Sequence, residues 1–367
     1  MKAIAVTPGS PGTFLVERDR PQIQAPDDIE VKVLDVGICG TDREEAAGGR
    51  CKTPEGRQDI VIGHEMLGSV QETGKAVTQV RPGDYIVFTV RRGCGHCAAC
   101  AMGRPDMCTT GDYTERGIWG HDGYQSELVV DGEQYCVKVP QELRGIGVLV
   151  EPLSVAEKAI DEGVMVQRGR LPYVRDTAGV LSNRNILVAG LGPIGLLAAF
   201  ILRLRGARVY GLDVVDRGSP RASLLEQIGG TYIDGRKVMV DDITKVHGTM
   251  DMVFEATGVA SLEFDLLDTL GQNGLYVLTG IPGGDRPVQV RGAEIIRQLV
   301  LDNRVMIGSV NASKAHYTMA VDDLLRSRQV YGTAIDKVIT QRVPSRDFGD
   351  AFLRHTAEEI KTIIQWG

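Results

Sequence analysis

Hydrophobic and polar positions divide the chain into a β-rich first part and a second part of a different kind. Residues 1–90 contain short apolar segments separated by turns, and residues 91–123 are rich in Gly, Cys and polar side chains without regular periodicity. Strands are expected at Ala3–Thr7, Ile29–Val36, Gly68–Thr73 and Asp84–Val90. The segment 91–123 therefore needs something other than apolar burial to hold its fold.

From about Pro152 the pattern changes to alternating helices and strands. Leu153–Ile160 has apolar residues at helical spacing, and five strands follow a polar connector. These strands are expected at Asn185–Ala189, Ala207–Asp213, Met252–Ala256, Gly274–Gly280 and Val305–Gly308. Such alternation predicts an α/β domain in which helices cover both faces of a parallel sheet. For the C-terminal part we expect an amphipathic helix at His316–Arg326, then a short strand and a closing helix.

Length, charge and cysteine content narrow the classes of protein. A chain of 367 residues suggests two domains, and a net charge of −7 argues against binding to nucleic acid or an anionic membrane. The longest apolar run, Ile194–Leu202, is too short to span a bilayer, and the N-terminus has no secretory pattern, so we expect a cytoplasmic protein. The seven cysteines then suggest metal binding or catalysis rather than disulfides.

A glycine-rich turn follows the strand Asn185–Ala189 and precedes an apolar helix. In Gly190-Leu191-Gly192-Pro193-Ile194-Gly195, the first glycine permits a tight turn, the second admits a pyrophosphate to the backbone, and the third lets helix and strand pack closely. A pyrophosphate would lie at the positive end of the helix. The segment predicts a dinucleotide site.

An acidic residue ends the next strand. Asp213 lies 21 residues after Gly192, where a carboxylate accepts hydrogen bonds from ribose hydroxyls and repels a 2′-phosphate. NAD is therefore favoured over NADP. Arg217 and Arg221 follow closely, and their reach toward a phosphate keeps NADP as the alternative.

Two groups of residues have the chemistry of metal ligands. Cys94, Cys97, Cys100 and Cys108 are spaced C-x2-C-x2-C-x7-C, which suits a structural zinc ion, with an iron–sulfur cluster as the chemical alternative. A second, dispersed group offers one sulfur, one imidazole and two carboxylates, the mixed donors of an open catalytic zinc site. Its members are Cys39, His64, Glu65 and Glu151.

Taken together, these motifs resemble the zinc-dependent medium-chain dehydrogenases, and among them the archaeal-type glucose 1-dehydrogenases. The resemblance extends along nearly the whole chain. It is carried by the segments Gly37–Glu44, Gly63–Glu65, Val90–Gly95, Gly103–Asp106, Glu115–Ile118, Asp122–Gly123, Glu151–Leu153, Gly190–Gly195, Glu255–Gly258 and Gly308–Asn311.

The resemblance implies a GroES-like, β-rich catalytic domain with a Rossmann domain inserted into it. The catalytic domain would comprise residues 1–154 and 309–367, with a structural zinc lobe at 91–123, and the dinucleotide-binding domain residues 155–308. Two zinc ions per chain are expected, one catalytic and one structural. Relatives are dimers or tetramers, so we expect a homo-oligomer joined through the C-terminal half of the Rossmann sheet.

The resemblance also implies roles for individual residues. Cys39 and His64 would bind the catalytic zinc directly, and Glu65 and Glu151 would complete its shell directly or through water. The substrate proton would leave through Thr41 or a carboxylate such as Glu65. Sugar hydroxyls would meet Glu115, Glu151 and Asn311, with His121 in the substrate cleft. The expected cofactor contacts are Gly190, Gly192, Pro193, Ile194, Gly195, Asp213, Thr257 and Asn311.

The reaction implied is oxidation of the anomeric hydroxyl of an aldose, with D-glucose as the expected substrate, to the aldonolactone. Related enzymes that use NADP carry paired arginines after the second Rossmann strand, where this chain has Val214 and Val215, which agrees with NAD. The alternatives are a polyol, secondary-alcohol or threonine dehydrogenase of the same family. A non-catalytic dinucleotide-binding protein is the alternative from another class.

Overall fold

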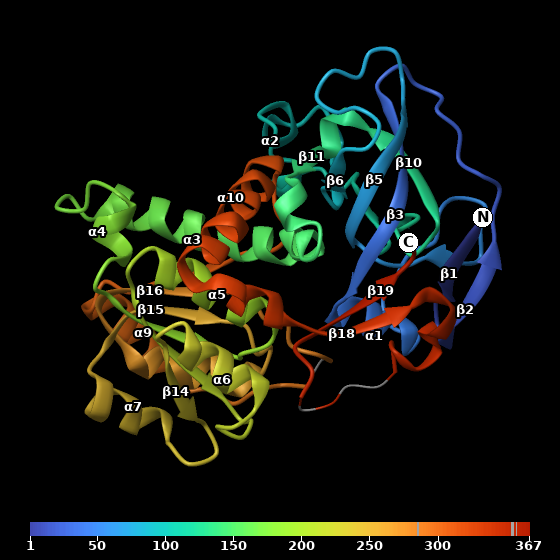
Figure 1. The fold of residues 1–367 in the computed structure, drawn as a ribbon. Coiled ribbons are helices and arrows are strands. Elements are labelled where there is room, and N and C mark those ends of the chain that lie inside the picture. The colour runs from blue at the N-terminus through green and yellow to red at the C-terminus, as the bar shows by residue number, and fades with distance from the viewer. Residues whose placement is uncertain (285, 354–355, 357) are drawn as a thin grey trace. The chain divides into compact units, whose positions relative to one another are not determined.

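The computed structural model describes residues 1–284, 286–353, 356 and 358–367, and the chain divides into two compact units (Figure 1). The first unit comprises Met1–Ser154, Asn311–Leu325 and Ile339–Gly367. The second comprises Val155–Val310 and Arg326–Val338. Among the described residues, no helix is both long and apolar enough to cross a membrane.

The first unit is built on a seven-stranded sheet in the order β11-β6-β5-β3-β19-β18, with β10 also paired to β3. Two smaller sheets, in the orders β2-β1-β4 and β7-β8-β9, belong to the same unit. Its strands are β1 (Lys2–Thr7), β2 (Ser10–Glu17), β3 (Asp28–Ile38), β4 (Ile60–Val61), β5 (Glu65–Thr73), β6 (Tyr85–Phe88), β7 (Arg91–Arg92), β8 (Thr114–Arg116), β9 (Gly120–His121), β10 (Leu128–Gly132), β11 (Cys136–Val139), β18 (Ile339–Pro344) and β19 (Lys361–Gln365).

Strand β3 organises the core of this unit. Ile29, Val31, Val33 and Val36 are fully buried along it, and they pack with side chains from β5, β6 and β10. Its helices are α1 (Gly40–Ala46) and α2 (Ala98–Ala101), and the first turn of α3 (Val150–Arg170) and most of α10 (Lys314–Tyr331) also belong to the unit. The β-rich start that the sequence predicts is confirmed, although the pattern did not reveal β2.

The end of the chain differs from the expectation. The predicted closing helix is wrong, because Lys361–Gln365 forms β19, which inserts between β3 and β18. Ile360, Ile363 and Ile364 have a spacing that also fits a helix, but all three are buried in the first unit. Pairing with the distant strand β3 determined the outcome.

The second unit is a six-stranded sheet in the order β14-β13-β12-β15-β16-β17, with parallel pairing throughout the described strands. This order reverses direction between β12 and β15, which makes that position the switch point where dinucleotides bind. Its elements are α4 (Thr177–Leu181), β12 (Asn185–Ala189), α5 (Pro193–Leu204), β13 (Arg208–Asp213), α6 (Pro220–Gln227), β14 (Thr231–Asp234), α7 (Val240–His247), β15 (Met250–Glu255), α8 (Ala260–Asp265), β16 (Leu270–Leu278), α9 (Gly292–Leu301) and β17 (Val305–Gly308).

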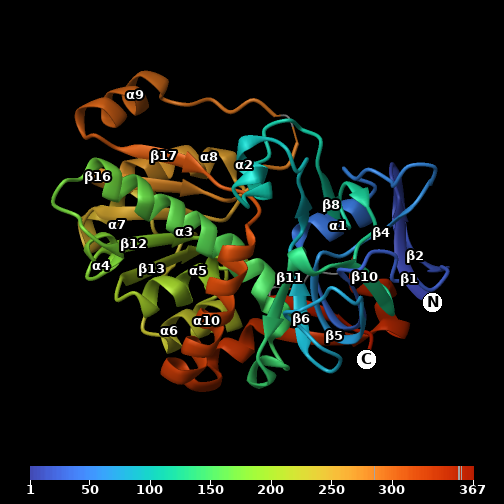
Figure 2. The same ribbon diagram turned by 90° about the horizontal axis from the view of Figure 1, so that it is seen from above.

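Both faces of the central strand β12 are covered. Val188 faces α5, where a Cβ on Gly195 would meet it, while Leu187 and Ala189 point the other way, into a cluster that contains Ile243 of α7. Helices α5 and α6 contact each other (Figure 2). The predicted α/β fold class is thus confirmed. Strand β14 was not predicted, because Thr231–Asp234 offers only two buried residues.

Candidate functional site

Neighbouring strands bring Cys39, His64 and Glu65 together. Strand β3 ends at Ile38 and β5 begins at Glu65, and the two pair with Gly37 opposite Glu65. The Sγ atom of Cys39 lies 3.1 Å from Nε2 of His64. Ligand atoms of the three residues all lie within 4.8 Å of one another. Residues that are 25 positions apart in the sequence therefore form one donor group.

Asp42 holds this group in place from helix α1. Its Oδ2 atom accepts a hydrogen bond of 2.8 Å from the backbone N–H of Cys39, and Oδ1 accepts one of 3.1 Å from Gly63. The same Oδ1 lies 3.6 Å from Nδ1 of His64. Cys39 caps α1 in turn, because its sulfur accepts from the backbone N–H of Thr41 at 3.2 Å. In the sequence, Asp42 is noticeable only as part of a motif, and the pattern does not indicate its role.

Lys361 is the second residue that sequence reasoning missed. Its ammonium is fully buried and donates to Oε1 of Glu65 at 2.6 Å and to the carbonyl of Ile38 at 3.0 Å. Oε2 of Glu65 is buried and has no hydrogen-bond partner within the described chain. One oxygen of Glu65 is therefore committed, and the other is free to bind a ligand.

The charges around this group favour a cation. Asp42, Glu45, Glu65 and Glu151 are all buried, and among the described residues their cationic partners are Lys361, which pairs with Glu65, and His64, which lies beside Asp42. Burial, with neighbouring carboxylates, raises the pKa of Glu151 to about 7 and that of Glu45 to about 9. Sulfur, imidazole and the orphaned carboxylate oxygen are donors that zinc accepts, so the residues present fit a zinc ion.

Glu151 and Thr41 lie near this donor group without belonging to it. Glu151 is in the first turn of α3, and His64 and Glu65 both influence its pKa. It is not in the set of ligand atoms that lie within 4.8 Å of one another. Thr41 is half-buried, in the first turn of α1.

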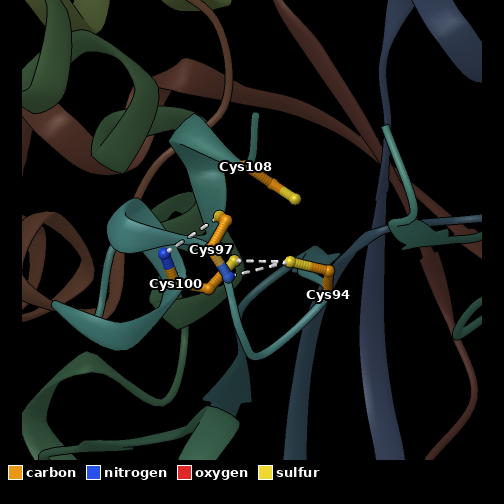
Figure 3. Close-up of side chains that lie close together, drawn as sticks. All are labelled: Cys94, Cys97, Cys100 and Cys108. Carbon is orange, nitrogen blue, oxygen red and sulfur yellow. Dashed lines mark hydrogen bonds between the residues drawn. The ribbon is translucent and has the colours of Figure 1, made fainter. Parts of the chain in front are cut away.

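The four cysteines of the 91–123 segment converge on one point (Figure 3). Their sulfur atoms lie within 4.8 Å of one another, and Sγ of Cys94 is 3.9 Å from Sγ of Cys100. Backbone N–H groups of Cys97 and Cys100 donate to the sulfurs of Cys94 and Cys97. Hydrogen bonds from the backbone of Thr109 and Cys100 lower the pKa of Cys97 to about 5, which favours the thiolate that binds metal.

Two of the predicted sugar-binding residues are in direct contact. Nδ2 of Asn311 donates to Oε1 of Glu115 at 2.7 Å, across 196 positions of sequence. Asn311 has a left-handed backbone with φ of 64°, a conformation that asparagine tolerates. Gly117, in the turn after Glu115, lies so close to Gly63 that a Cβ on it would be 2.5 Å from the Gly63 carbonyl oxygen. The turn between β8 and β9, at residues 117–119, therefore lies against the residue that precedes His64.

His121 lies on β9, directly after this turn. Its ring is half-buried, and burial, together with the charge of Arg116, lowers its pKa to about 3. The imidazole is therefore neutral at physiological pH.

The glycine-rich turn has the form expected for a phosphate-binding loop. Gly190 has φ of +85°, and a Cβ on Gly195 would be 1.8 Å from the Gly190 carbonyl oxygen. Gly192 is the N-cap of α5 without a capping side chain, and Pro193 follows as the first helical residue. The N–H groups of this helix terminus are therefore available to an anion. Ile194 is half-buried in the same turn.

Asp213 is fixed at the end of β13. Its Oδ2 atom accepts from the Leu191 backbone at 2.8 Å, and Oδ1 accepts from Val214 at 2.6 Å. The carboxylate thus lies against the glycine-rich turn. Arg217 is paired with Glu226, and Arg221 lies 3.7 Å from Asp213.

Glu255 organises the loop that contains Thr257, a role that the sequence did not indicate. Its Oε1 atom accepts from the backbone N–H and the hydroxyl of Thr257, each at 2.5 Å, and from Gly258 at 3.1 Å. Oε2 accepts from Gly280 at 3.2 Å. One buried carboxylate therefore ties together the loops that follow β15 and β16, and Gly190 lies against the same loop at Ala256.

Comparisons with known proteins agree with this architecture. Residues 144–366 match the model of the glucose dehydrogenase C-terminus, and residues 25–141 match the alcohol dehydrogenase GroES-like domain. The chain is 35% identical to a glucose 1-dehydrogenase of Methanocella arvoryzae, with 100% of both chains covered. It is 37% identical to a glucose 1-dehydrogenase of Thermoproteus tenax, over 100% of this chain and 99% of the relative.

A solved structure is similar over the full length. It is the glucose dehydrogenase of Haloferax mediterranei in complex with NADP, zinc and gluconolactone, with a TM-score of 0.89, 32% identity, and coverage of 100% of this chain and 99% of that one. Galactitol-1-phosphate dehydrogenase of Escherichia coli, at 21% identity and a TM-score of 0.80, shares the fold.

Fold and donor groups together define a zinc-dependent, nicotinamide-using dehydrogenase of the medium-chain class. Within that class, the chain belongs to the glucose dehydrogenase family.

Proposed function

We propose that this chain oxidises the anomeric hydroxyl of an aldose, D-glucose first of all, to the aldonolactone, with a nicotinamide as hydride acceptor. The observation that carries the proposal is the contact between Glu115 and Asn311, together with the packing of the turn after Glu115 against the residue that precedes His64. Glu115 and Asn311, which can hydrogen-bond to sugar hydroxyls, would then lie near the zinc-binding group of Cys39, His64 and Glu65. The Haloferax structure, whose ligands are NADP, zinc and gluconolactone, supports the same substrate class.

The residues of the chain suit each step of the reaction. A bound zinc ion supplies Lewis acidity toward the anomeric hydroxyl, and a bound nicotinamide supplies the hydride acceptor. Cys39, His64 and Oε2 of Glu65 would hold the metal, with Glu151 alongside. C1 loses its hydrogen with the electron pair, the hydroxyl loses a proton, and C1–O becomes the lactone carbonyl. Since Lys361 engages the other oxygen of Glu65, we assign to the Thr41 hydroxyl the relay of that proton: it would accept the proton and donate its own to solvent water.

Initial rates on a panel of aldoses, polyols and simple alcohols test the proposal. We expect reduced nicotinamide to accumulate with aldoses, and a chelator to abolish the rate. Turnover with a polyol or a secondary alcohol but with no aldose would refute the assignment.

We further propose that the chain holds two zinc ions and prefers NAD to NADP. Metal analysis should give about two zinc ions per chain, because the two donor groups are separate. A measured content of one zinc ion per chain would mean that only one of the two donor groups binds zinc, and it would refute the two-site proposal. The carboxylate of Asp213 and the exposed Val214 favour NAD, because no guanidinium takes the place of Val214 to receive a 2′-phosphate.

Substitution of Asp213 tests the cofactor preference. Asp213→Ser should lower the ratio of kcat/KM for NAD over NADP by about tenfold or more, because it removes both ribose acceptors and a repelling charge. An unchanged ratio would refute the role of Asp213.

We also propose that the chain forms a homo-oligomer through β17. This strand is at the edge of the six-stranded sheet, and α9 before it exposes Ile296, Val300 and Leu301 by 64%, 68% and 70%. An unpaired edge beside exposed apolar side chains suits pairing with a second copy. Light scattering should give the mass of a dimer or tetramer. The double variant Ile296→Glu with Val300→Glu should shift the measured mass toward that of a monomer.

A further inference from the structure

The two oxygens of the Glu115 carboxylate have different environments. Oε1 accepts two hydrogen bonds, from Nε of Arg91 at 3.0 Å and from Nδ2 of Asn311 at 2.7 Å, and Nη2 of Arg91 lies 3.0 Å from it as part of the same ion pair. The hydrogen bonds that Glu115 accepts from described side chains both go to Oε1 and none goes to Oε2, and the Glu115 side chain is 13% exposed. The orientation of the free oxygen is therefore set by what holds the other one.

Arg91 also reaches the four-cysteine segment. Its Nη1 atom donates to the backbone carbonyl of Asp106 at 2.8 Å, and its guanidinium stacks over the ring of Tyr113 at 4.1 Å. Asp106 is buried, pairs with Arg104, and lies two residues before Cys108. The side chain of Arg91 thus links Glu115 to the backbone next to Cys108, one of the four cysteines of the predicted zinc site.

We propose that Arg91 is a positioning residue that couples the four-cysteine segment to Glu115, so that a metal in that segment sets the affinity for the sugar. This inference rests on the proposed function, in which Glu115 meets a sugar hydroxyl, and Oε2 is the oxygen that would accept it because Oε1 is held by Arg91 and Asn311. The planar guanidinium suits the task because its five donors have fixed directions, and one group can hold a carboxylate and a carbonyl at the same time. A lysine ammonium at the same position is a point charge that lacks this fork.

The first experiment replaces Arg91 and compares sugar with cofactor. Arg91→Met should raise KM for glucose by about tenfold, the usual effect of losing a hydrogen bond to a charged group, and change kcat by less than about threefold. Arg91→Lys should give an intermediate KM. The Kd for NAD, measured by fluorescence titration without sugar, should stay unchanged in both variants.

Arg144 provides a matched control. It too donates to a buried carboxylate, Asp35 at 2.6 Å, and its guanidinium lies 5.7 Å from the centre of the Tyr85 ring. Arg144→Met should therefore reproduce any general loss of stability without raising KM for glucose. If Arg91→Met and Arg91→Lys keep the parental KM, or if Arg144→Met raises it equally, the proposal is overturned.

A double-mutant cycle tests whether Arg91 acts through Glu115. Glu115→Gln should itself raise KM, and Arg91→Met should add little in that background, because the group it positions has changed. Full additivity of the two effects would show that Arg91 acts by another route and would overturn the proposal.

A substitution of a cysteine in the four-cysteine segment tests whether bound metal is the origin of the coupling. Cys108→Ser, with zinc content measured, should lose one zinc ion per chain and raise KM for glucose in the parent, but add little in Arg91→Met. A raised KM in both backgrounds alike would contradict the link through Arg91. If Cys108→Ser does not fold, the Arg91 and Glu115 cycle decides alone. Failure of the proposed function itself is distinct, since the parent would then reduce no nicotinamide with any aldose.

Discussion

Lys361 shows how one residue controls the candidate metal site. Its buried ammonium neutralises one of several buried carboxylates and directs Glu65 by occupying a single oxygen. Removing one partner of a buried ion pair leaves an uncompensated charge, which is more costly than losing the contact alone.

Lys361→Met should therefore lower the free energy of unfolding by about 3–5 kcal/mol, as measured by urea denaturation. Zinc bound per chain should also fall, since Glu65 loses its fixed orientation. The double variant Glu65→Gln with Lys361→Met should recover part of the stability but not the zinc. Parental stability and parental zinc content in Lys361→Met would contradict this role.

The surroundings of Asp131 indicate how the free energy of unfolding should change at acidic pH. Burial alone would raise its pKa, but the guanidiniums of Arg116 and Arg92, which both donate to Oδ2, outweigh burial and lower it to about 2. Since the folded pKa lies below the ordinary value of 3.8, the group stabilises the fold above that pH. This contribution is lost as the pH falls from about 4 to about 2.

In Asp131→Asn the slope of unfolding free energy against pH between 2 and 4 should become flatter. The variant should also be about 3–5 kcal/mol less stable near pH 7, because two buried guanidiniums lose their counter-charge. Urea unfolding at a series of pH values measures both effects. An unchanged slope would assign the acid response to other carboxylates.

At the residue level, sequence spacing and chemical type identified the two donor groups, because sulfur and imidazole ligands stand out in a chain. The supporting residues did not stand out. Lys361 is an ordinary lysine in the sequence, and its partner Glu65 lies 296 positions away. Arg91 and Glu255 likewise acquire their roles only through contacts that the fold creates.

Among the elements, the loops after β15 and β16 depend on one side chain. Glu255→Gln replaces an acceptor that serves four donors with an amide that cannot accept at both ends. We expect the Kd for NAD, measured by fluorescence, to rise by about tenfold. Glu294→Gln, an exposed acid in the same unit, is the control and should leave the Kd unchanged. A Kd that does not move in Glu255→Gln would exclude a role of this loop in cofactor binding.

Elements with strong apolar runs were predictable, and those defined by distant pairing were not. β12 and β17 have the expected bounds, and α3 and α10 extend beyond the expected helices at both ends. The strand β2 has no fully buried residue, so no alternation marked it. For β19, the same isoleucine spacing fits helix and strand, and only pairing with β3 separates them.

For the whole molecule, the last strand completes the first unit. β19 lies between β3 and β18 and carries Lys361 to Glu65. A chain that ends before residue 361 should lose the catalytic zinc and show a strongly lowered Tm, because β3 loses a pairing partner and the buried charge is uncompensated. Removal of Gly367 alone, which is exposed, should change neither. Zinc analysis and thermal melts check both, and a truncated chain that keeps zinc and Tm would contradict this account.

The contact of Gly117 and Gly123 with Gly63 constrains how this protein can change. A Cβ on either residue would lie within 2.5 Å of the Gly63 carbonyl oxygen, so backbone meets backbone with no side chain between them. A contact without side chains cannot be retuned by small substitutions, and the segment 115–123 cannot move outward in gradual steps. Evolution toward another substrate is therefore confined to exchanging the side chains that the segment 115–123 carries, while the distance of this segment from Cys39, His64 and Glu65 stays fixed.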